Sequence, residues 1–304
     1  MTGVRVAVPA KINLSLRVGP LRPDGFHDLA TIFQAVSLID ELTVTQGDPG
    51  TGRTITVRGE RIEGVPLDDR NLAARAAIAV GQLAGRNDPD VRIDIDKSIP
   101  VAGGMAGGSA DAAATLVACR RLWDVDIDDA VLHRLAAELG SDVPFSLLGG
   151  TARGTGRGEH LVPVLDGGQW HWVVALDEGE LSTPAVFAEY DRLRATGGAV
   201  PALGSDDELI AALRSGSPQE LAPLLVNDLQ PAALALRPSL SVILEVGTEM
   251  GALAGMVSGS GPTCVFLAAD RDHAIGLAAE LAGTGRVRGV RHAVGPVRGA
   301  HIVA

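Results

Sequence analysis

The stretch Pro100-Val101-Ala102-Gly103-Gly104-Met105-Ala106-Gly107-Gly108-Ser109-Ala110, called here the glycine-rich loop, decides the fold. An alternating strand pattern at 91–95 precedes it, and an alanine-rich helix is predicted from Ala110 to about Trp123. A strand, a glycine-rich loop and a helix in this order bind phosphate, because glycine lets backbone N–H groups approach an anion and the helix N-terminus adds partial positive charge. A connection without any ligand is the alternative interpretation.

Two common phosphate-binding motifs are absent from the chain. The loop has no Gly-Lys-Ser/Thr ending, which excludes a Walker A P-loop, and no G-x-G-x-x-G occurs, which excludes the dinucleotide fingerprint. We place Ser109 at the N-cap of the predicted helix. Asp111 follows in the predicted first turn, where a negative charge suits the helix dipole.

The composition limits the classes of partner. The chain has 304 residues, 46% of them hydrophobic and 21% charged, and its net charge is −11. No basic field exists to attract nucleic acid or an anionic membrane, so neither is a predicted partner. No apolar run of about 18 residues occurs, so we predict neither a signal peptide nor a membrane span but a cytoplasmic protein. Cys119 and Cys264 lie far apart between apolar neighbours, which predicts two buried side chains without a disulfide or a zinc site.

Strand and helix patterns fill the rest of the chain and predict the α/β (α+β) class. In the first half, strands are predicted at 4–8, 12–18, 29–39, 41–45 and 53–58, helices at 71–84 and 128–139, a connection at 9–11, and turns at 19–28 and 141–144. In the second half, strands are predicted at 170–176, 263–268 and 286–294, and helices at 184–194, 207–214, 219–226, 238–250 and 272–282. The composition turns to glycine and arginine at 149–158. We therefore predict one domain over 1–157 and a second over 158–304.

Three segments, in order along the chain, resemble the motifs of the GHMP kinases, a family named for galacto-, homoserine, mevalonate and phosphomevalonate kinases. They are Pro9–Leu14, Pro100–Ala113 and Val257–Thr263. The resemblance implies two α/β (α+β) domains, the first of which binds ATP, with the active site in the cleft between them. It implies that the glycine-rich loop holds ATP together with Mg²⁺, and that Ser109 contacts the metal. The loop departs from the family's usual sequence at Met105, Ala106 and Ala110, and the last change removes one hydroxyl contact to phosphate.

Four further segments resemble one branch of that family. They are Ala10–Leu14, Pro23–His27, Gly140–Phe145 and Asn227–Leu229. Enzymes of this branch phosphorylate the 2-hydroxyl of 4-(cytidine 5'-diphospho)-2-C-methyl-D-erythritol, a small molecule of the non-mevalonate isoprenoid pathway. The resemblance implies that Lys11 and Asp142 are the catalytic pair. It also implies a set of substrate-binding residues, with two aromatic rings on the faces of the cytosine and a histidine at its edge: Asn13, Phe26, His27 and Phe187.

The proposed catalytic residues also have ordinary structural interpretations. Asp142 follows a Gly-Ser turn and precedes Val-Pro, where an aspartate often caps a turn or a helix. Lys11 stands between two strand patterns, where an exposed surface lysine is the default expectation. Asn13 is two residues further on, so it should share the face of the strand on which Lys11 lies.

The same holds for the other segments. Phe26 and Phe187 have packing on the core as their alternative. The alternative for Ser258–Gly261 is a simple tight turn, and the alternative for Asn227-Asp228 is a helix cap.

Two other functions stay open at this point. One is a different small-molecule GHMP kinase, of the mevalonate or sugar kinase type. The other is a non-catalytic nucleotide-binding regulator that keeps the fold. Loss of the Lys–Asp pair would mark such a regulator, and this chain has both residues. The sequence does not predict an oligomeric state.

Overall fold

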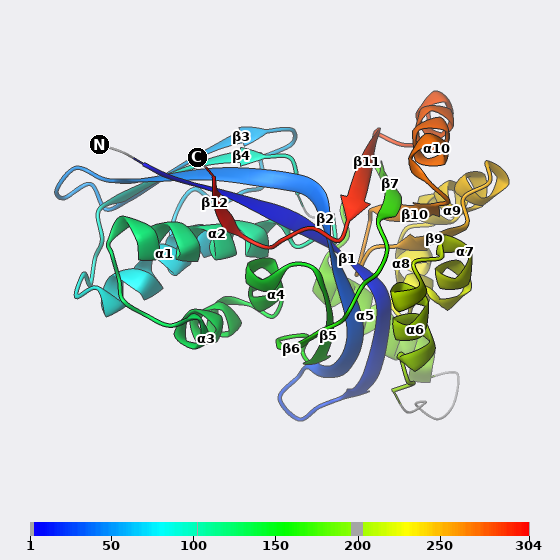
Figure 1. Cartoon of the computed structure of the whole chain (residues 1–304), viewed down its shortest axis with the longest axis horizontal. Helices are drawn as coiled ribbons and strands as arrows, with labels where there is room; N and C mark the ends of the chain where they lie inside the picture. The colour runs from blue at the N-terminus through cyan, green and yellow to red at the C-terminus, as the bar shows by residue number, and fades with distance from the viewer. Residues whose placement is uncertain (1–2, 102, 196–202, 304) are drawn as a thin grey trace.

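A computed structural model describes residues 3–101, 103–195 and 203–303 (Figure 1). Ala102, which was expected at the ATP site, lies outside these ranges, as does much of the polar loop at 196–207. The described elements form two β-sheets with helices packed on them, which confirms the α/β (α+β) class.

The first sheet is built around one long hairpin. Its main path runs β12–β1–β2–β4–β3, with β5 pairing with β2 and β6, and β8 pairing with β1. The strands are β1 (Val4–Leu21), β2 (His27–Gln46), β3 (Arg53–Gly59), β4 (Val91–Lys97), β5 (Thr151–Gly156), β6 (His160–Pro163), β8 (Val226–Asn227) and β12 (His301–Val303). Because β12 pairs with the start of β1, the first and last strands of the chain lie side by side (Figure 1).

Strand β1 is continuous through residues 9–11, where the sequence predicted a connection. Its pairing with β2 shifts register between Pro9 and Ala10, and again between Asn13 and Ser15. Proline has no N–H for the ladder and is tolerated at such an irregularity, so it does not end the strand. The hairpin therefore carries Lys11 into the middle of the molecule.

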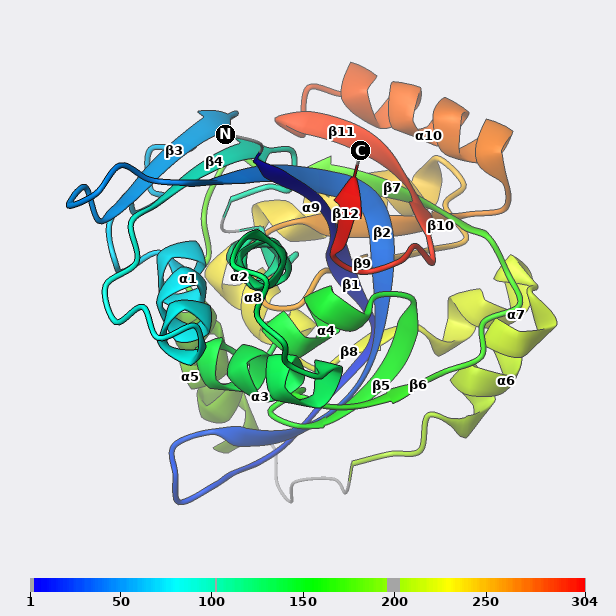
Figure 2. The ribbon, with the colours of Figure 1, turned by 60° about the vertical axis from the view of Figure 1, so that its left-hand side comes forward.

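Helices α1 (Leu72–Leu83), α2 (Gly107–Leu122) and α4 (Val143–Leu148) pack on one face of the first sheet, and α3 (Asp129–Leu139) packs on these three helices. Figure 2 shows α2 end-on, surrounded by the other three. It packs on β1 and β2, and its buried residues are mostly alanines: Ala110, Ala112, Ala113, Ala114 and Ala118. Small side chains allow close packing on all sides. The predicted turn is present at residues 141–142, and α4 begins directly after it, with Pro144 in its first turn, where the fixed φ of proline suits a helix.

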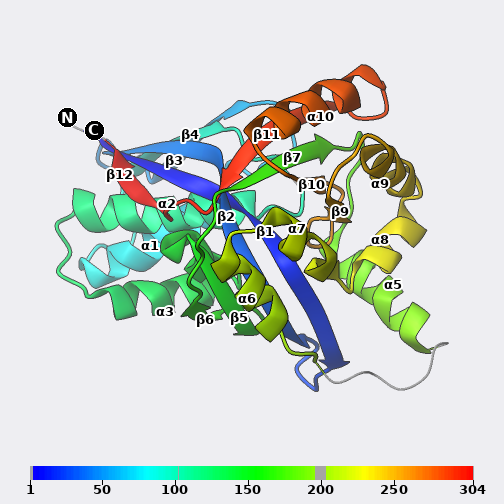
Figure 3. The ribbon, with the colours of Figure 1, turned by 45° about the vertical axis from the view of Figure 1, so that its right-hand side comes forward.

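The second sheet is antiparallel, in the order β11–β7–β10–β9. Its strands are β7 (Trp170–Leu176), β9 (Ala254–Val257), β10 (Cys264–Ala268) and β11 (Gly289–Gly295). The helices of this part are α5 (Thr183–Ala195), α6 (Asp207–Ser215), α7 (Pro218–Leu221), α8 (Gln230–Leu236), α9 (Ser239–Glu249) and α10 (Arg271–Gly283), with a 3₁₀ turn at Ala222–Leu224. Helix α10 packs along β11 and β7 (Figure 3). The helix predicted at 219–226 is instead α7, the 3₁₀ turn and β8.

The cysteines, the helix lengths and the connections between the sheets complete the description of the fold. Cys119 and Cys264 are buried and unpaired, as predicted. In the part of the chain that is described, no helix has both the length and the apolar character needed to cross a membrane. The chain passes from the first sheet to the second between β6 and β7 and returns for β8 and β12. The domain boundary at 157 stays a prediction.

Candidate active site

The residues expected at the active site surround one cavity of about 900 Å³. Those that line it are Lys11, Asn13, Phe26, His27, Pro100, Val101, Gly103, Gly104, Ala106, Gly107, Gly108, Asp142 and Phe187. Met105 and Ala110 do not, because both are buried beneath the loop. Ser109 lies in the first turn of α2 beside the lining residues. The segments named from the sequence, far apart along the chain, thus meet at one place.

The glycine-rich loop enters α2 through a left-handed residue. Ala106 is the N-cap, with a φ of 61°, and the helix begins at Gly107. The predictions of Ser109 as N-cap and of Asp111 in the first turn are therefore wrong. A non-glycine residue in the left-handed conformation costs roughly 1–2 kcal/mol. The packing of the loop, and not helix propensity, therefore determines where α2 begins. The N–H groups of Gly107, Gly108 and Ser109 have no intrahelical acceptor and are available to an anion.

The loop at 258–261 packs directly on the glycine-rich loop. The Ser258 hydroxyl donates to the carbonyl oxygen of Gly104 at 3.2 Å. A Cβ on Gly104 would lie 2.2 Å from the Ser258 carbonyl oxygen, and its φ is +73°, so this position requires glycine. Asn227 holds the other side of the 258–261 loop, since its Nδ2 donates to the carbonyl oxygens of Val257 and Gly259 at 2.8 Å each. The segment is therefore part of the cavity wall and not a simple surface turn.

Lys11 and Asp142 lie side by side in the cavity. Lys11 is only 7% exposed, so the default expectation of a surface lysine is wrong. Its Nζ donates to Asn13 Oδ1 at 2.7 Å and lies 3.8 Å from Asp142 Oδ2. Asp142 directly precedes α4, but its side chain makes no capping hydrogen bond there. The arrangement presents one acidic and one basic group together beside the glycine-rich loop.

A second charged cluster adjoins the glycine-rich loop, and the sequence analysis missed it. Lys97 Nζ donates to Asp40 Oδ2 at 2.5 Å and to Asp111 Oδ2 at 2.8 Å, and all three side chains are at most 3% exposed. Burial raises the pKa of Asp111 to about 7, with Lys97 opposing this rise and Asp40 adding to it. Burial acts to lower the pKa of Lys97, but the two carboxylates outweigh it and leave that pKa raised. The signal in the sequence that could have revealed this cluster is Lys97, a charged residue at the end of the strand that precedes the glycine-rich loop.

The other end of the cavity is aromatic. Phe26, on the turn between β1 and β2, is 50% exposed, so it does not pack on the core. The ring of His27 is buried and stacks on Phe187, with centroids 5.2 Å apart. Its Nδ1 lies 2.8 Å from the Gly19 carbonyl oxygen, so this nitrogen donates and only Nε2 is left for a ligand. Phe187 also packs against the core beneath α5, as its structural alternative expects, and its contact to the base stays a prediction.

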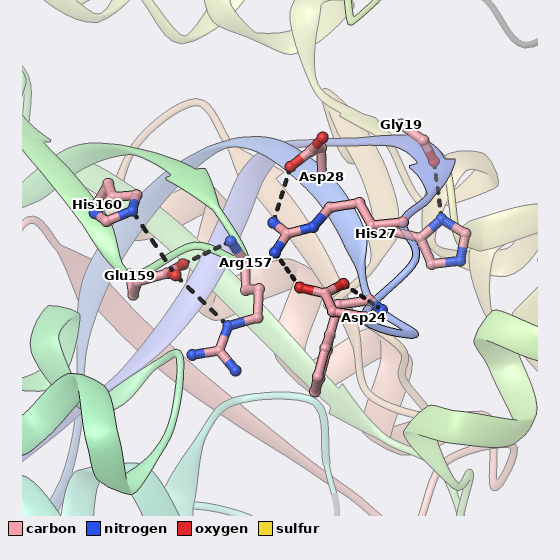
Figure 4. A network of polar contacts seen from close by, with 9 residues as sticks. Gly19, Asp24, His27, Asp28, Arg157, Glu159 and His160 are labelled. Atoms are coloured by element: carbon pink, nitrogen blue, oxygen red, sulfur yellow. Dashed lines mark hydrogen bonds and ion pairs between the residues drawn. The ribbon is translucent and has the colours of Figure 1, made fainter.

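Figure 4 shows charged side chains around the turn that carries Phe26. The guanidinium of Arg157, from the turn between β5 and β6, lies 5.0 Å from the centroid of the Phe26 ring. Glu159 accepts from the backbone N–H of Arg157 at 2.6 Å and lies 3.5 Å from its Nε. Arg157 therefore adds positive charge near an exposed ring, a role that the glycine- and arginine-rich composition of 149–158 did not reveal.

Comparisons with known proteins agree with this geometry. The family model described as "GHMP kinases N terminal domain" matches residues 71–150, and the model described as "GHMP kinases C terminal" matches residues 209–287. The 4-diphosphocytidyl-2-C-methyl-D-erythritol kinase of Nocardia farcinica is 57% identical, over 99% of this chain and 96% of that protein. The enzyme of the same name from Mycolicibacterium smegmatis is 56% identical, over 99% and 92%.

A solved structure extends the agreement to three dimensions. The crystal structure of a 4-(cytidine 5'-diphospho)-2C-methyl-D-erythritol kinase matches with a TM-score of 0.74 and 32% identity, over 95% of this chain and 98% of that chain. Family models, relatives and structure therefore point the same way. The chain belongs to the GHMP kinase family, in the group of the 4-diphosphocytidyl-2-C-methyl-D-erythritol kinases.

Proposed function

We propose that this protein transfers the γ-phosphoryl group of ATP to the 2-hydroxyl of 4-(cytidine 5'-diphospho)-2-C-methyl-D-erythritol, giving the 2-phosphate and ADP, in the non-mevalonate isoprenoid pathway. The observation that carries the proposal is the pair Lys11 and Asp142 in the same cavity as the glycine-rich loop. Phosphoryl transfer depends mainly on positioning the reactants and on placing charge around the transferred group. The substrates are small molecules, and we place the enzyme in the cytoplasm.

Asp142 is assigned to the acceptor alcohol. Its carboxylate would hold the 2-hydroxyl in line with the γ-phosphorus and take its proton as the new O–P bond forms. The bond from the γ-phosphorus to the bridging oxygen breaks, and ADP leaves with that electron pair. Because such transition states are largely dissociative, orientation of the hydroxyl is the larger part of this work.

Lys11 is assigned to charge stabilisation. Its ammonium is fixed by Asn13 and lies beside Asp142, so it would meet the negative charge of the transferring phosphoryl group without reorganisation. Asn13 uses Oδ1 for Lys11, and its Nδ2 donates to Thr31 Oγ1 at 2.9 Å. The main role assigned to Asn13 is therefore to orient Lys11, and its expected contact to the substrate is a secondary role.

The glycine-rich loop is assigned to the phosphates of ATP. Mg²⁺, when bound with ATP, neutralises phosphate charge during transfer. Within the described ranges, no three His, Cys, Asp or Glu side chains gather as a metal site. Mg²⁺ in kinases usually keeps several waters and binds through one or two protein oxygens plus substrate phosphates. The Ser109 hydroxyl would hold it, and the buried Oδ1 of Asp111, which has no hydrogen-bond partner among the described residues, is a further oxygen at this end of α2.

The aromatic end is assigned to the cytidine. Phe26 and Phe187 supply the rings on which the base would stack, and His27 presents Nε2 toward the base edge. Stacking of this kind contributes about 1–3 kcal/mol per base. The cytidine diphosphate would then run from Phe26 along the cavity toward Asp142.

An ADP-release assay with a panel of alcohols tests the proposal. We expect ADP release with the cytidine-linked methylerythritol and none above background with mevalonate, homoserine or galactose. Phosphorus NMR of the product should show a new monoester at the 2-position. Transfer to mevalonate or a sugar instead would establish a different kinase of the family, and ATP binding without transfer to any alcohol would establish a regulator.

A further inference from the structure

One face of α5 lines the cavity beside the proposed cytosine site. Pro184, Phe187, Ala188 and Asp191 all line it. Their spacing of three and four residues puts them on the same side of the helix. Of these four residues, Asp191 alone is charged, and it follows the proposed stacking ring by one helical turn. The helix therefore presents a carboxylate next to an aromatic ring.

Asp191 contacts the one free nitrogen of His27. Its Oδ2 lies 3.4 Å from His27 Nε2, and the side chains are 42% and 5% exposed. Because Nδ1 donates to the Gly19 carbonyl oxygen, Nε2 of the neutral ring carries the lone pair and is an acceptor. Among the described residues, neither His27 Nε2 nor the Asp191 carboxylate makes a hydrogen bond. Two acceptors thus stand together at the cavity wall, where a ligand with an N–H donor would satisfy both.

We propose that Asp191 selects cytosine over uracil by accepting a hydrogen bond from the exocyclic amino group of the base. This assignment rests on the proposed function, which puts the base against Phe187. Cytosine carries an amino donor at position 4, whereas uracil carries a carbonyl oxygen there, and aspartate and glutamate are the side chains that accept from the cytosine amino group. Uracil would set its oxygen against the carboxylate, and such an unpaired contact disfavours the wrong ligand.

The assignment does not depend on the charge of His27. If the imidazole is protonated, Nε2–H donates to one oxygen of Asp191, and the other oxygen still accepts from the amino group. The stack of His27 on Phe187 fixes the ring that Asp191 touches. Asp191 is thus a specificity residue, and we expect it to act on substrate binding and not on the transfer step.

The test compares kcat/KM for the cytidine substrate and for its uridine counterpart in the wild type and in Asp191→Asn. An amide can either donate or accept, so the variant should discriminate less. We expect the ratio to fall about fivefold or more, the lower end of what a good base-edge contact contributes to discrimination. The change should appear in KM, with kcat at saturation kept. Glu189→Gln is the matched control, because Glu189 lies on the same helix, pairs with Arg192 at 2.7 Å and should leave the ratio unchanged.

Calorimetric titration with CDP and UDP measures the same discrimination without turnover. It includes Asp191→Ala as a second variant in case the first is poorly folded. If the wild type binds CDP better than UDP but does not phosphorylate the cytidine substrate, the proposed function fails and Asp191 is still tested. If both Asp191 variants keep the wild-type ratio, the assignment of Asp191 is overturned.

Discussion

Lys11 is fixed from several directions before any substrate arrives. Its backbone N–H donates to the Met105 carbonyl oxygen at 3.3 Å, which ties β1 to the glycine-rich loop. Its Nζ is held by Asn13 and lies 5.3 Å from the centroid of the Phe33 ring. A flexible lysine side chain normally loses considerable rotamer entropy when it is ordered. Here the fold has already ordered it, which is what a charge that stabilises a transition state requires.

Replacement of Phe26 by alanine tests the stacking platform. Loss of one ring should remove about 1–3 kcal/mol of base stacking, so KM for the cytidine substrate should rise about 5- to 150-fold. KM for ATP should stay near the wild-type value. Steady-state kinetics with each substrate varied in turn measures both. Val162→Ala, at a 63% exposed position on β6, is the control for a lost exposed apolar side chain.

A rise in KM for ATP alone would place Phe26 in the adenine pocket. That outcome would contradict the assignment of the aromatic end to the cytidine.

The elements around the cavity show how far the sequence carries. The alanine run predicted α2, and periodicity predicted β7 with the observed bounds, because these signals are local. The start of α2 was misplaced, since Ala106 adopts its left-handed conformation under tertiary packing of the loop. The contact of Lys97 with Asp40 joins residues 57 positions apart, which no local pattern contains. The meeting of the three motifs was expected from the family resemblance and not from periodicity.

Loop-on-loop packing predicts opposite effects at two glycines of the same segment. A methyl group at Gly104 would meet the Ser258 carbonyl oxygen at 2.2 Å, whereas one at Gly108 would meet no heavy atom within 4 Å. We expect Gly104→Ala to lower the free energy of unfolding by about 2 kcal/mol or more, through overpacking and backbone strain. Gly108→Ala should leave it unchanged or raise it slightly, because alanine favours a helix. Urea unfolding measures both, and equal effects would contradict the observed packing.

The buried cluster of Lys97, Asp40 and Asp111 predicts a pH-dependent stability. The pKa of Asp111 in the fold, about 7, lies above the ordinary aspartate value of about 4. The folded state therefore binds more protons than the unfolded chain between these values, and the contribution of Asp111 to the free energy of unfolding falls as pH rises through this window. Asp111→Asn removes that contribution. In urea unfolding, the free energy of unfolding of the variant should rise relative to that of the wild type from about pH 4 to about pH 7. A difference that stays constant across this range would contradict the prediction.

At the scale of the whole molecule, β1 joins the two halves of the site. Its start pairs with β12, Ser15 and Leu16 pair with β8, and the turn after it carries Phe26. The chain carries a net charge of −11, yet both proposed substrates are anions. Four cationic side chains line the cavity, Lys11, Arg70, Lys97 and Arg157, but Asp111, Asp142 and Asp191 line it as well, and Lys97 is already paired with two carboxylates. Binding of the proposed anionic substrates is therefore assigned to local donors, above all the free N–H groups at the start of α2 and the exposed cations of the wall, and not to the overall charge.

Lys11 and Asp142 are the residues to which we assign phosphoryl transfer in this cavity. The most direct measurement is kcat of Asp142→Asn with ATP and the cytidine substrate both saturating, since this change keeps the shape of the side chain and removes its charge. We predict a fall of at least about a hundredfold, in line with the loss of a general base, while calorimetry shows that both substrates still bind. Adding Lys11→Met should lower kcat little further, because residues that act as a unit are not additive. A near-normal kcat for Asp142→Asn would overturn the catalytic assignment and leave Asp142 as a residue of the turn before α4.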